Sequence, residues 1–226
     1  MRMRKKKNLE SRLEACLDRL IIIDLDVSER DFSLAENRRD YIDFSRYFEK
    51  EAPIHLEIGC GKGQFVCEMA KRHPDIHFIA VEKTANVIVS AAESAKRQGI
   101  KNLVFMRSCA EYLPSYIKPD SVERLYLNFS CPFPKKKYAN HRLTASPFLK
   151  IYKQLLKKNA EIHFKTDNKG LFEFSLEQLT GNGYALKNVS LDLHASDFEG
   201  NIVTEYEQKF VSQGLPIYRL EAFVKD

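Results

Sequence analysis

The chain has 226 residues, of which 44% are hydrophobic, 11% aromatic and 30% charged, and its formal net charge is +5. This composition is typical of a globular domain of the larger kind and excludes a disordered or collagen-like chain. No apolar run approaches the roughly 18 residues that a membrane-spanning helix needs, and the basic start lacks the apolar core of a signal peptide. We therefore expect a cytoplasmic protein without a membrane partner.

The five cysteines have irregular spacing, and no two of them form a C-x-x-C pair. This pattern predicts reduced thiols, with neither a disulfide framework nor a bound metal.

The elements expected along the chain fall into two parts. Residues 1–50 are charge-rich and weakly patterned, and we expect a basic arm with a flanking helix there; residues 51–226 form the main domain. From Pro53 onward, strand-like and helix-like segments alternate. The expected strands are 55–58, 77–81, 103–106, 124–129, 161–165, 186–193 and 217–224, and the expected helices are 64–72, 85–98, 147–158 and 171–179.

This alternation predicts an α/β fold with an open, mainly parallel sheet of seven strands. The last two strands lack a full helical crossover between them, which favours an antiparallel edge. In such sheets ligands bind beyond the carboxyl ends of the strands. We therefore expect functional residues near Glu57 to Gly63, Glu82, Cys109, Cys131 and Asp167.

The first of these places is a glycine-rich bend, Gly59, Gly61 and Gly63, between a strand and a helix. Glycines let the backbone approach a ligand, and the following helix offers free N–H groups. About 20 residues later, Glu82 ends the next strand, where a carboxylate can bind both hydroxyls of a ribose.

The spacing of the bend distinguishes two cofactors. It reads G-x-G-x-G instead of the G-x-G-x-x-G of dinucleotide sites, and Glu57 stands two residues before its first glycine. A carboxylate there repels a pyrophosphate and attracts the ammonium and sulfonium of S-adenosylmethionine (SAM). We therefore favour SAM over NAD(P), with a structural acid that caps the turn as the alternative role of Glu57.

Four segments together form a recognisable set: L-E-I-G-C-G-K-G-Q-F at 56–65, N-F-S-C-P-F-P-K-K at 128–136, H-F-K-T-D-N at 163–168 and T-E-Y-E at 204–207. In these segments the chain resembles the bacterial tRNA (guanine-N7-)-methyltransferase family. The resemblance implies a Rossmann-like class I fold with helices on both faces of the sheet. It also implies methyl transfer from SAM to N7 of a guanine in the variable loop of tRNA, nucleotide 46.

The resemblance and the position of each residue give an expected set of roles. The substrate-binding residues are expected to be Lys135, Asp167, Thr204, Glu205, Tyr206 and Glu207. The cofactor-binding residues are expected to be Glu57, Gly59, Gly61, Gly63, Glu82, Cys109 and Cys131.

Two positions depart from the family pattern. Cys131 stands where relatives carry Asp in an Asp-Pro-Trp run, so the catalytic role of position 131 is in doubt. Cys109 also stands where relatives tend to carry Asp. However, N7 of guanine is an unprotonated lone pair that needs no general base. Orientation alone can supply about 7–11 kcal/mol of the barrier. We therefore expect a working enzyme; attack on a pyrimidine by a Cys131 thiolate is the alternative.

Guanine must also be distinguished from adenine. Its N1–H and N2–H₂ are parallel donors that one carboxylate can accept, and the wrong base would leave buried groups unpaired. Asp167 is the first candidate acceptor and Glu207 the second. The alternative role of Asp167 is the N-cap of the following helix.

Basic residues are clustered although the net charge is small. The stretch between Glu123 and Glu161 contains no acid, and a second cluster comprises Arg2, Arg4, Lys5, Lys6 and Lys7. Such clusters predict a polyanionic partner, here tRNA; a solvated helix face is the alternative. Tyr138 or Phe133 could stack on a base or simply pack. The residues expected to contact phosphates are Lys136, Lys137, His141 and Arg142.

Two other functions remain open at this point. An amino-methyltransferase is one, because Ser130-Cys131-Pro132-Phe133 partly resembles the motif that holds an amino group. The other is a non-catalytic tRNA-binding protein with a degraded site, which the two cysteines favour. The sequence also leaves a monomer and a homodimer open.

Overall fold

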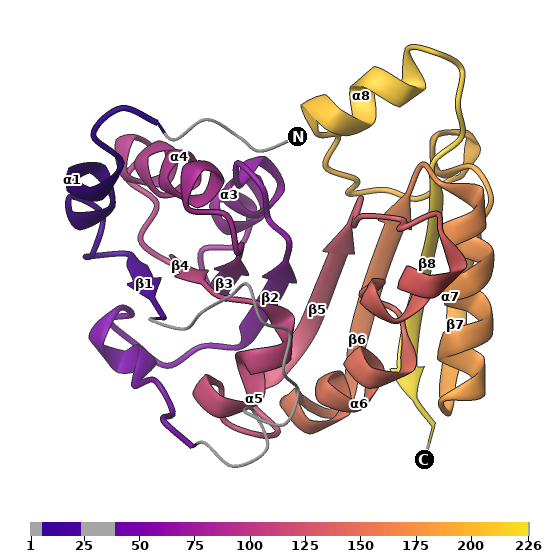
Figure 1. Cartoon of the computed structure of the whole chain (residues 1–226), viewed down its shortest axis with the longest axis horizontal. Helices are drawn as coiled ribbons and strands as arrows, with labels where there is room; N and C mark the ends of the chain where they lie inside the picture. The colour runs from indigo at the N-terminus through magenta and orange to yellow at the C-terminus, as the bar shows by residue number, and fades with distance from the viewer. Residues whose placement is uncertain (1–5, 24–38, 226) are drawn as a thin grey trace. The chain divides into compact units, whose positions relative to one another are not determined.

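The computed structural model describes residues 6–23 and 39–225 (Figure 1). The basic residues Arg2, Arg4 and Lys5 lie outside the described residues. The chain divides into two compact units, Met1–Lys118 and Pro119–Asp226. Among the described residues, each unit contains four strands.

The first unit contains a parallel sheet in the order β1-β4-β3-β2. The strand β3 is buried at all five positions, as its continuous apolar run predicts for a strand covered on both faces. Since all the strands run the same way, their carboxyl ends lie at one edge of this sheet. The strands are β1 (Leu20–Ile22), β2 (Ile54–Ile58), β3 (His77–Val81) and β4 (Leu103–Arg107).

The strand β1 corrects the expected strand number, because residues 6–23 and 39–225 contain eight strands where the sequence predicted seven. It has only three residues, too few to show an alternating pattern. It forms because Leu20 pairs with Phe105 of β4, and because the N–H of Phe105 donates to the carbonyl of Arg19 at 2.8 Å.

The helices of the first unit bury small and branched side chains. Ile88, Ala92 and Ala95 share one face of α4, which packs on β4. The helix α1 packs on α4, where Arg12 donates two 2.7 Å hydrogen bonds to Glu93. Residues 9–22 are therefore part of the first unit. Its helical segments are α1 (Leu9–Glu14), η1 (Phe44–Arg46), α3 (Gln64–Arg72), α4 (Ala85–Arg97), η2 (Ala110–Tyr112) and α5 (Leu113–Tyr116).

The second unit has the strand order β5-β6-β8-β7. The pair β5 and β6 is parallel, whereas β8 is antiparallel to both of its neighbours, which confirms the antiparallel edge. The elements are β5 (Val122–Asn128), η3 (Lys136–His141), α6 (Ser146–Leu155), β6 (Leu156–Thr166), α7 (Lys169–Gly181), β7 (Tyr184–Ser190), η4 (Leu193–Ala195), α8 (Glu205–Val211) and β8 (Tyr218–Val224).

The boundary between α6 and β6 differs from the expected one. We expected a helix through residue 158, but it ends at Leu155 and the strand begins at once. Lys157 instead pairs with Glu123 at 2.7 Å, next to the place where Val122 of β5 pairs with Leu156. The pairing with β5 therefore places residues 156–158 in a strand, although their own sequence favours a helix.

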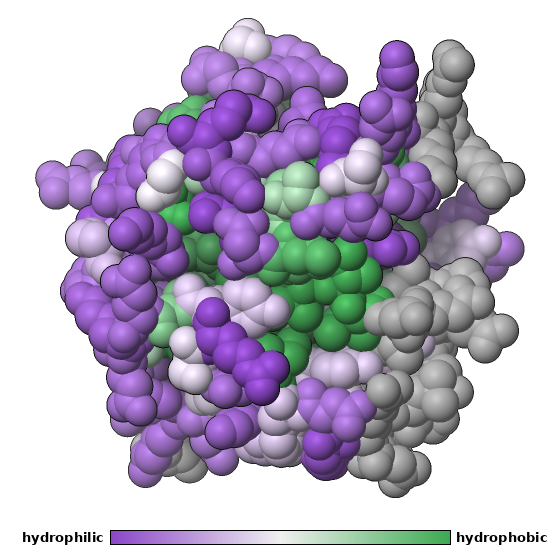
Figure 2. Space-filling view, turned by 90° about the vertical axis from the view of Figure 1, so that its left-hand side faces the viewer, coloured by the Kyte–Doolittle hydropathy of each residue, from purple (hydrophilic) through white to green (hydrophobic). Residues whose placement is uncertain are grey.

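The surface of the first unit includes an apolar area on the side of β1. Figure 2 shows hydrophobic side chains that gather on this face. In this part of the chain Leu17 is half exposed, and Ile21 and Ile22 are partly exposed. No helix in the described part of the chain is long and apolar enough to cross a membrane.

Candidate functional site

The glycine bend of the first unit joins β2 to α3. Its glycines have φ values of +81°, +57° and +75°, a backbone region that other residues rarely adopt. A Cβ on Gly63 would lie 2.9 Å from the Cβ of Ala91, so packing requires glycine there. A Cβ on Gly59 or Gly61 would meet nothing within 4 Å. These two positions therefore border open space, which a ligand can occupy.

Two carboxylates stand beside this bend. Ile58 pairs with Val81, so Glu57 and Glu82 lie at the carboxyl ends of neighbouring strands. Glu57 is only 3% exposed; burial and then the charge of Glu57 raise the pKa of the Cys67 thiol to about 11. An Oε1 atom of Glu82 accepts a 2.8 Å hydrogen bond from the N–H of Thr84, which orients the carboxylate where α4 begins.

Cys109 lies at the carboxyl end of the next strand, β4. It is buried, and its carbonyl accepts a hydrogen bond from the N–H of Tyr112 at 3.2 Å. The N–H of Glu82 donates to the carbonyl of Met106, so the ends of β3 and β4 are held together. The first unit thus brings the glycine bend, both carboxylates and Cys109 to one edge of its sheet.

In the second unit, the loop after β5 carries Cys131, which is exposed. Phe129 and Phe133, on either side of it, have positive φ values of 50° and 41°. Such conformations are strained for large residues and persist only where other contacts hold them. Arg142 provides such contacts, because it donates to the carbonyls of Pro132 and Phe133 at 2.9 and 3.1 Å. These donors hold the loop, and the expected contact between Arg142 and RNA stays a prediction.

Asp167 follows β6 in the second unit. The expected alternative role of this residue, the helix cap, belongs to its neighbour: Asn168 accepts from the N–H of Leu171 at 2.8 Å. Burial, and then the charges of Asp167 and Cys131, raise the pKa of Tyr206. Asp167 and Cys131 therefore each lie within electrostatic reach of Tyr206.

The segment 204–207 begins helix α8. Thr204 caps the helix by accepting from the N–H of Glu207 at 3.2 Å. Tyr206 is half exposed, and its ring lies 5.1 Å from that of Phe129. Glu207 is 0% exposed, and its carboxylate accepts a hydrogen bond from Lys165 at 2.6 Å. The expected contact between Glu207 and guanine stays a prediction, but this carboxylate is already engaged within the protein.

The basic residues after this loop have different surroundings. Lys135 and Lys136 are exposed, and the Nζ atom of Lys137 lies 5.0 Å from the ring centre of Tyr138. The ring of His141 lies 5.6 Å from that of Tyr138. Three lysines and one exposed aromatic ring therefore lie on η3 and on the residue that precedes it.

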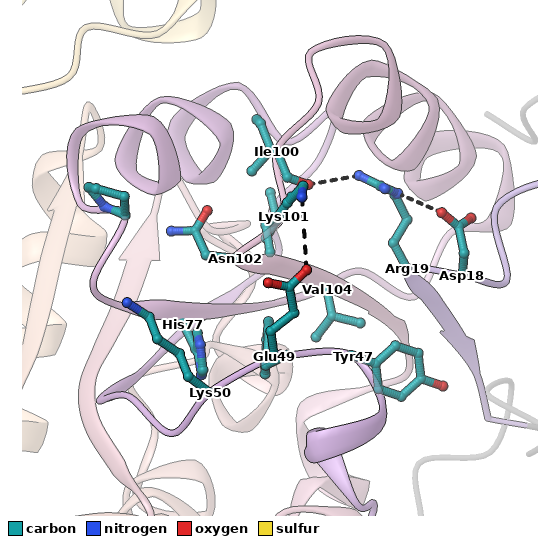
Figure 3. Close-up of a pocket in the computed structure, with 13 residues that line it drawn as sticks. Asp18, Arg19, Tyr47, Glu49, Lys50, His77, Ile100, Lys101, Asn102 and Val104 are labelled. Atoms are coloured by element: carbon teal, nitrogen blue, oxygen red, sulfur yellow. Dashed lines mark hydrogen bonds and ion pairs between the residues drawn. The ribbon is translucent and has the colours of Figure 1, made fainter.

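A cavity of about 520 Å³ lies elsewhere in the first unit (Figure 3). It is bordered by His77 and Leu103, which begin β3 and β4, so it lies at the amino ends of these strands. None of the expected site residues lines it. Four of its charged side chains form two pairs: Lys101 with Glu49 at 3.8 Å, and Arg19 with Asp18 at 3.2 Å.

One cluster in the second unit resembles a metal site. The side chains of Glu161, His163 and Glu221 offer ligand atoms within 4.8 Å of one another. However, Lys187 and Arg124 also pair with Glu161. Although burial opposes it, hydrogen bonds from His163 and Lys187 lower the pKa of Glu161 to about 2. The cluster is therefore an ion-pair network, and the absence of a metal stays a prediction.

The chain is similar to known proteins over most of its length. A family model described as "Putative methyltransferase" matches residues 51–220. A tRNA (guanine-N(7)-)-methyltransferase of Halalkalibacterium halodurans is 50% identical over 177 residues, which are 78% of this chain and 80% of that protein. The enzyme of the same name from Clostridioides difficile is 39% identical over 222 residues, 98% of each chain.

A solved structure shows the same fold. It is a 16S rRNA (adenine(1408)-N(1))-methyltransferase from Catenulisporales acidiphilia with its cosubstrate SAM, and it is 16% identical with a TM-score of 0.57. The match covers 90% of this chain and 93% of that chain, which confirms the Rossmann-like fold of SAM methyltransferases. The glycine bend and the relatives that match 78% and 98% of the chain lead to one assignment. The chain belongs to the SAM-dependent tRNA (guanine-N7-)-methyltransferase family.

Proposed function

We propose that this chain transfers a methyl group from SAM to N7 of the guanine at nucleotide 46, in the variable loop of tRNA. One observation carries the proposal: a buried carboxylate, Glu57, directly precedes a bend in which Gly59 and Gly61 border open space. This arrangement suits a cationic ligand that lies against the backbone. The names of the relatives supply the nucleotide base and the class of RNA.

The residues of the first unit can bind the positively charged groups and the ribose of SAM. Glu57 attracts its positive charge, and Glu82, oriented by Thr84, accepts hydrogen bonds from the ribose hydroxyls. The N–H groups at the start of α3 and the buried Cys109 border the same edge of the sheet. When bound, SAM supplies the methyl group on a sulfonium that makes it electrophilic. The protein has only to bind and orient this donor.

The residues of the second unit suit guanine. Asp167 accepts hydrogen bonds from N1–H and N2–H₂, and the ring of Tyr206 offers a surface for the base. Lys135 binds a neighbouring phosphate. Since N7 carries no proton, no residue has to act as a base; the residues hold the purine in line with the methyl donor and exclude water.

We infer further that residues 51–226 form the methyltransferase domain and that residues 1–50 support it. The enzyme acts in the cytoplasm on tRNA, as a monomer or a homodimer, and without a metal. Comparison of mass in solution with and without tRNA distinguishes the two assembly states.

The proposed function is tested with the purified chain, unmodified tRNA and SAM, followed by mass analysis of the nucleosides. We expect N7-methylguanosine from the variable loop. A methylated exocyclic amino group would support the amino-methyltransferase instead. Binding of tRNA without any methyl transfer would support the non-catalytic alternative. The same nucleoside should be missing from the tRNA of cells that lack the protein.

The Cys131→Asp variant should transfer methyl groups at a rate within about tenfold of wild type, because N7 of guanine needs no general base and orientation supplies most of the barrier reduction. The wild type should itself be active. Single-turnover rates of wild type, Cys131→Asp and Cys131→Ser measure this, the serine serving as a near-isosteric control. An inactive wild type that the aspartate rescues would show that the acid is essential to the chemistry.

Affinity for tRNA should fall steeply as salt rises, because lysines that contact phosphates release counterions on binding. The Lys136→Ala variant should lower the slope of log Kd against log salt by about 1. Lys169 on α7 is also exposed and pairs weakly with Glu173, so Lys169→Ala is the control. Equal slopes for the two variants would place the RNA surface elsewhere.

A further inference from the structure

A buried ion pair joins strand β6 to the first turn of helix α8. Asp167 follows β6 and Tyr206 lies on α8, and we call the part of the proposed site that they form with the Cys131 loop the guanine side. The side chains of Lys165 and Glu207 are 6% and 0% exposed, and the distance from Nζ to Oε2 is 2.6 Å. The Lys165 ammonium also donates to the carbonyl of Ile202 at 2.9 Å and to Oδ1 of Asn201 at 3.0 Å. Three hydrogen bonds thus satisfy a charge that burial would otherwise disfavour strongly.

Glu207 is held from its other side as well. Its Oε1 atom accepts from Nδ2 of Asn201 at 2.7 Å and lies 2.8 Å from Nε2 of His194. Both oxygens of this carboxylate are therefore engaged. Because Glu207 is the third residue of α8, the network fixes the first turn of that helix, which Thr204 caps and from which Tyr206 extends.

The same lysine also contacts Phe129, at the start of the Cys131 loop, and lies close to Asp167 in the chain. Its carbonyl accepts the N–H of Phe129 at 2.9 Å, and its ammonium lies 5.5 Å from the centre of the Phe129 ring. Phe129 is the strained residue that begins the Cys131 loop. Asp167 follows Lys165 by two residues at the end of β6. One residue, Lys165, therefore connects the end of β6, the Cys131 loop and helix α8 through its backbone and its buried side chain.

We propose that Lys165 is a positioning residue for the methyl transfer reaction. Lys165 acts through Glu207 and holds Tyr206 at a fixed position relative to Asp167. This inference rests on the proposed function. The lysine does not touch the guanine, because its donors are used within the protein. Its contribution is to keep the acceptor and the aromatic surface at a constant separation when tRNA binds.

The test compares single and double variants. Lys165→Met keeps the length of the side chain and removes its charge, which leaves Glu207 buried without its main partner. Adding Glu207→Gln removes the second charge as well, so the thermal midpoint should recover in the double variant. We expect kcat/KM for tRNA to remain about 30-fold or more below wild type in the double variant, with the Kd for SAM within about twofold.

The control is Lys96→Met on α4, which removes an exposed ion pair of 3.1 Å with Asp18 and should leave kinetics unchanged. Recovery of tRNA kinetics together with the thermal midpoint would show that the pair only stabilises the fold, and would overturn the inference. Wild-type kinetics in Lys165→Met would overturn it too. Failure of the proposed function looks different, because the wild type itself would then form no N7-methylguanosine.

Discussion

Replacing Asp167 by asparagine should lower kcat/KM for tRNA about 100-fold, because a carboxylate that accepts two guanine donors contributes about 2–3 kcal/mol. Asparagine keeps the size of the side chain but offers an N–H₂ group to one of these donors. The Kd for SAM should not change, since the bend that suits SAM lies in the other unit. Steady-state kinetics and calorimetric titration with SAM measure the two effects.

The control for this variant is Glu173→Gln, a similar loss of charge at an exposed position on α7. A second measurement uses tRNA with inosine in place of the target guanosine, which lacks the N2 amino group. Wild type should lose activity on this substrate, whereas Asp167→Asn should discriminate little between the two. Equal losses of SAM and tRNA binding in Asp167→Asn would indicate a folding defect and contradict the assigned role.

The Gly61→Ala variant should lose SAM affinity by roughly 30-fold or more, because a methyl group enters the space that the ligand needs. Gly99 is a matched control: its φ of +65° is close to the +57° of Gly61, and a Cβ there also meets nothing within 4 Å. Gly99→Ala should therefore carry the same backbone strain, about 1 kcal/mol, without a ligand effect.

Thermal unfolding and SAM titration of both variants separate strain from contact. The two thermal midpoints should fall by similar amounts, and only Gly61→Ala should lose SAM. If both variants bound SAM like wild type, the open space beside the bend would not be the cofactor site. Loss of binding in both would show that strain in the first unit, and not contact, controls affinity.

The order of elements and the place of the chemistry could be read from the sequence. Apolar runs that alternate with helical periods predict a mainly parallel sheet, and a parallel sheet places ligands after its strands. The glycine bend and Glu57 are neighbours in the chain, so a cofactor role could be predicted for them without tertiary information. Asp167, an acid that follows a strand, is a candidate on the same ground.

Only the tertiary structure decided features that depend on distant partners. The strand Leu20–Ile22 exists because β4, more than 80 residues later, pairs with it. The helix α6 ends at Leu155 because the next residues pair with β5. The cap of α7 belongs to Asn168 and not to Asp167, a choice that backbone geometry makes between adjacent residues.

In the proposed site, too, some features could be predicted from the sequence and others depend on tertiary contacts. The sequence by itself predicted which residue types should meet the cofactor and the base, since motifs of four to ten consecutive residues would carry that chemistry. It did not show that Arg142 holds a loop, nor that Lys165 is buried against Glu207, 42 residues away along the chain. A charged side chain looks solvent-exposed in a sequence, because the partners that make its burial favourable come together only when distant segments fold onto one another.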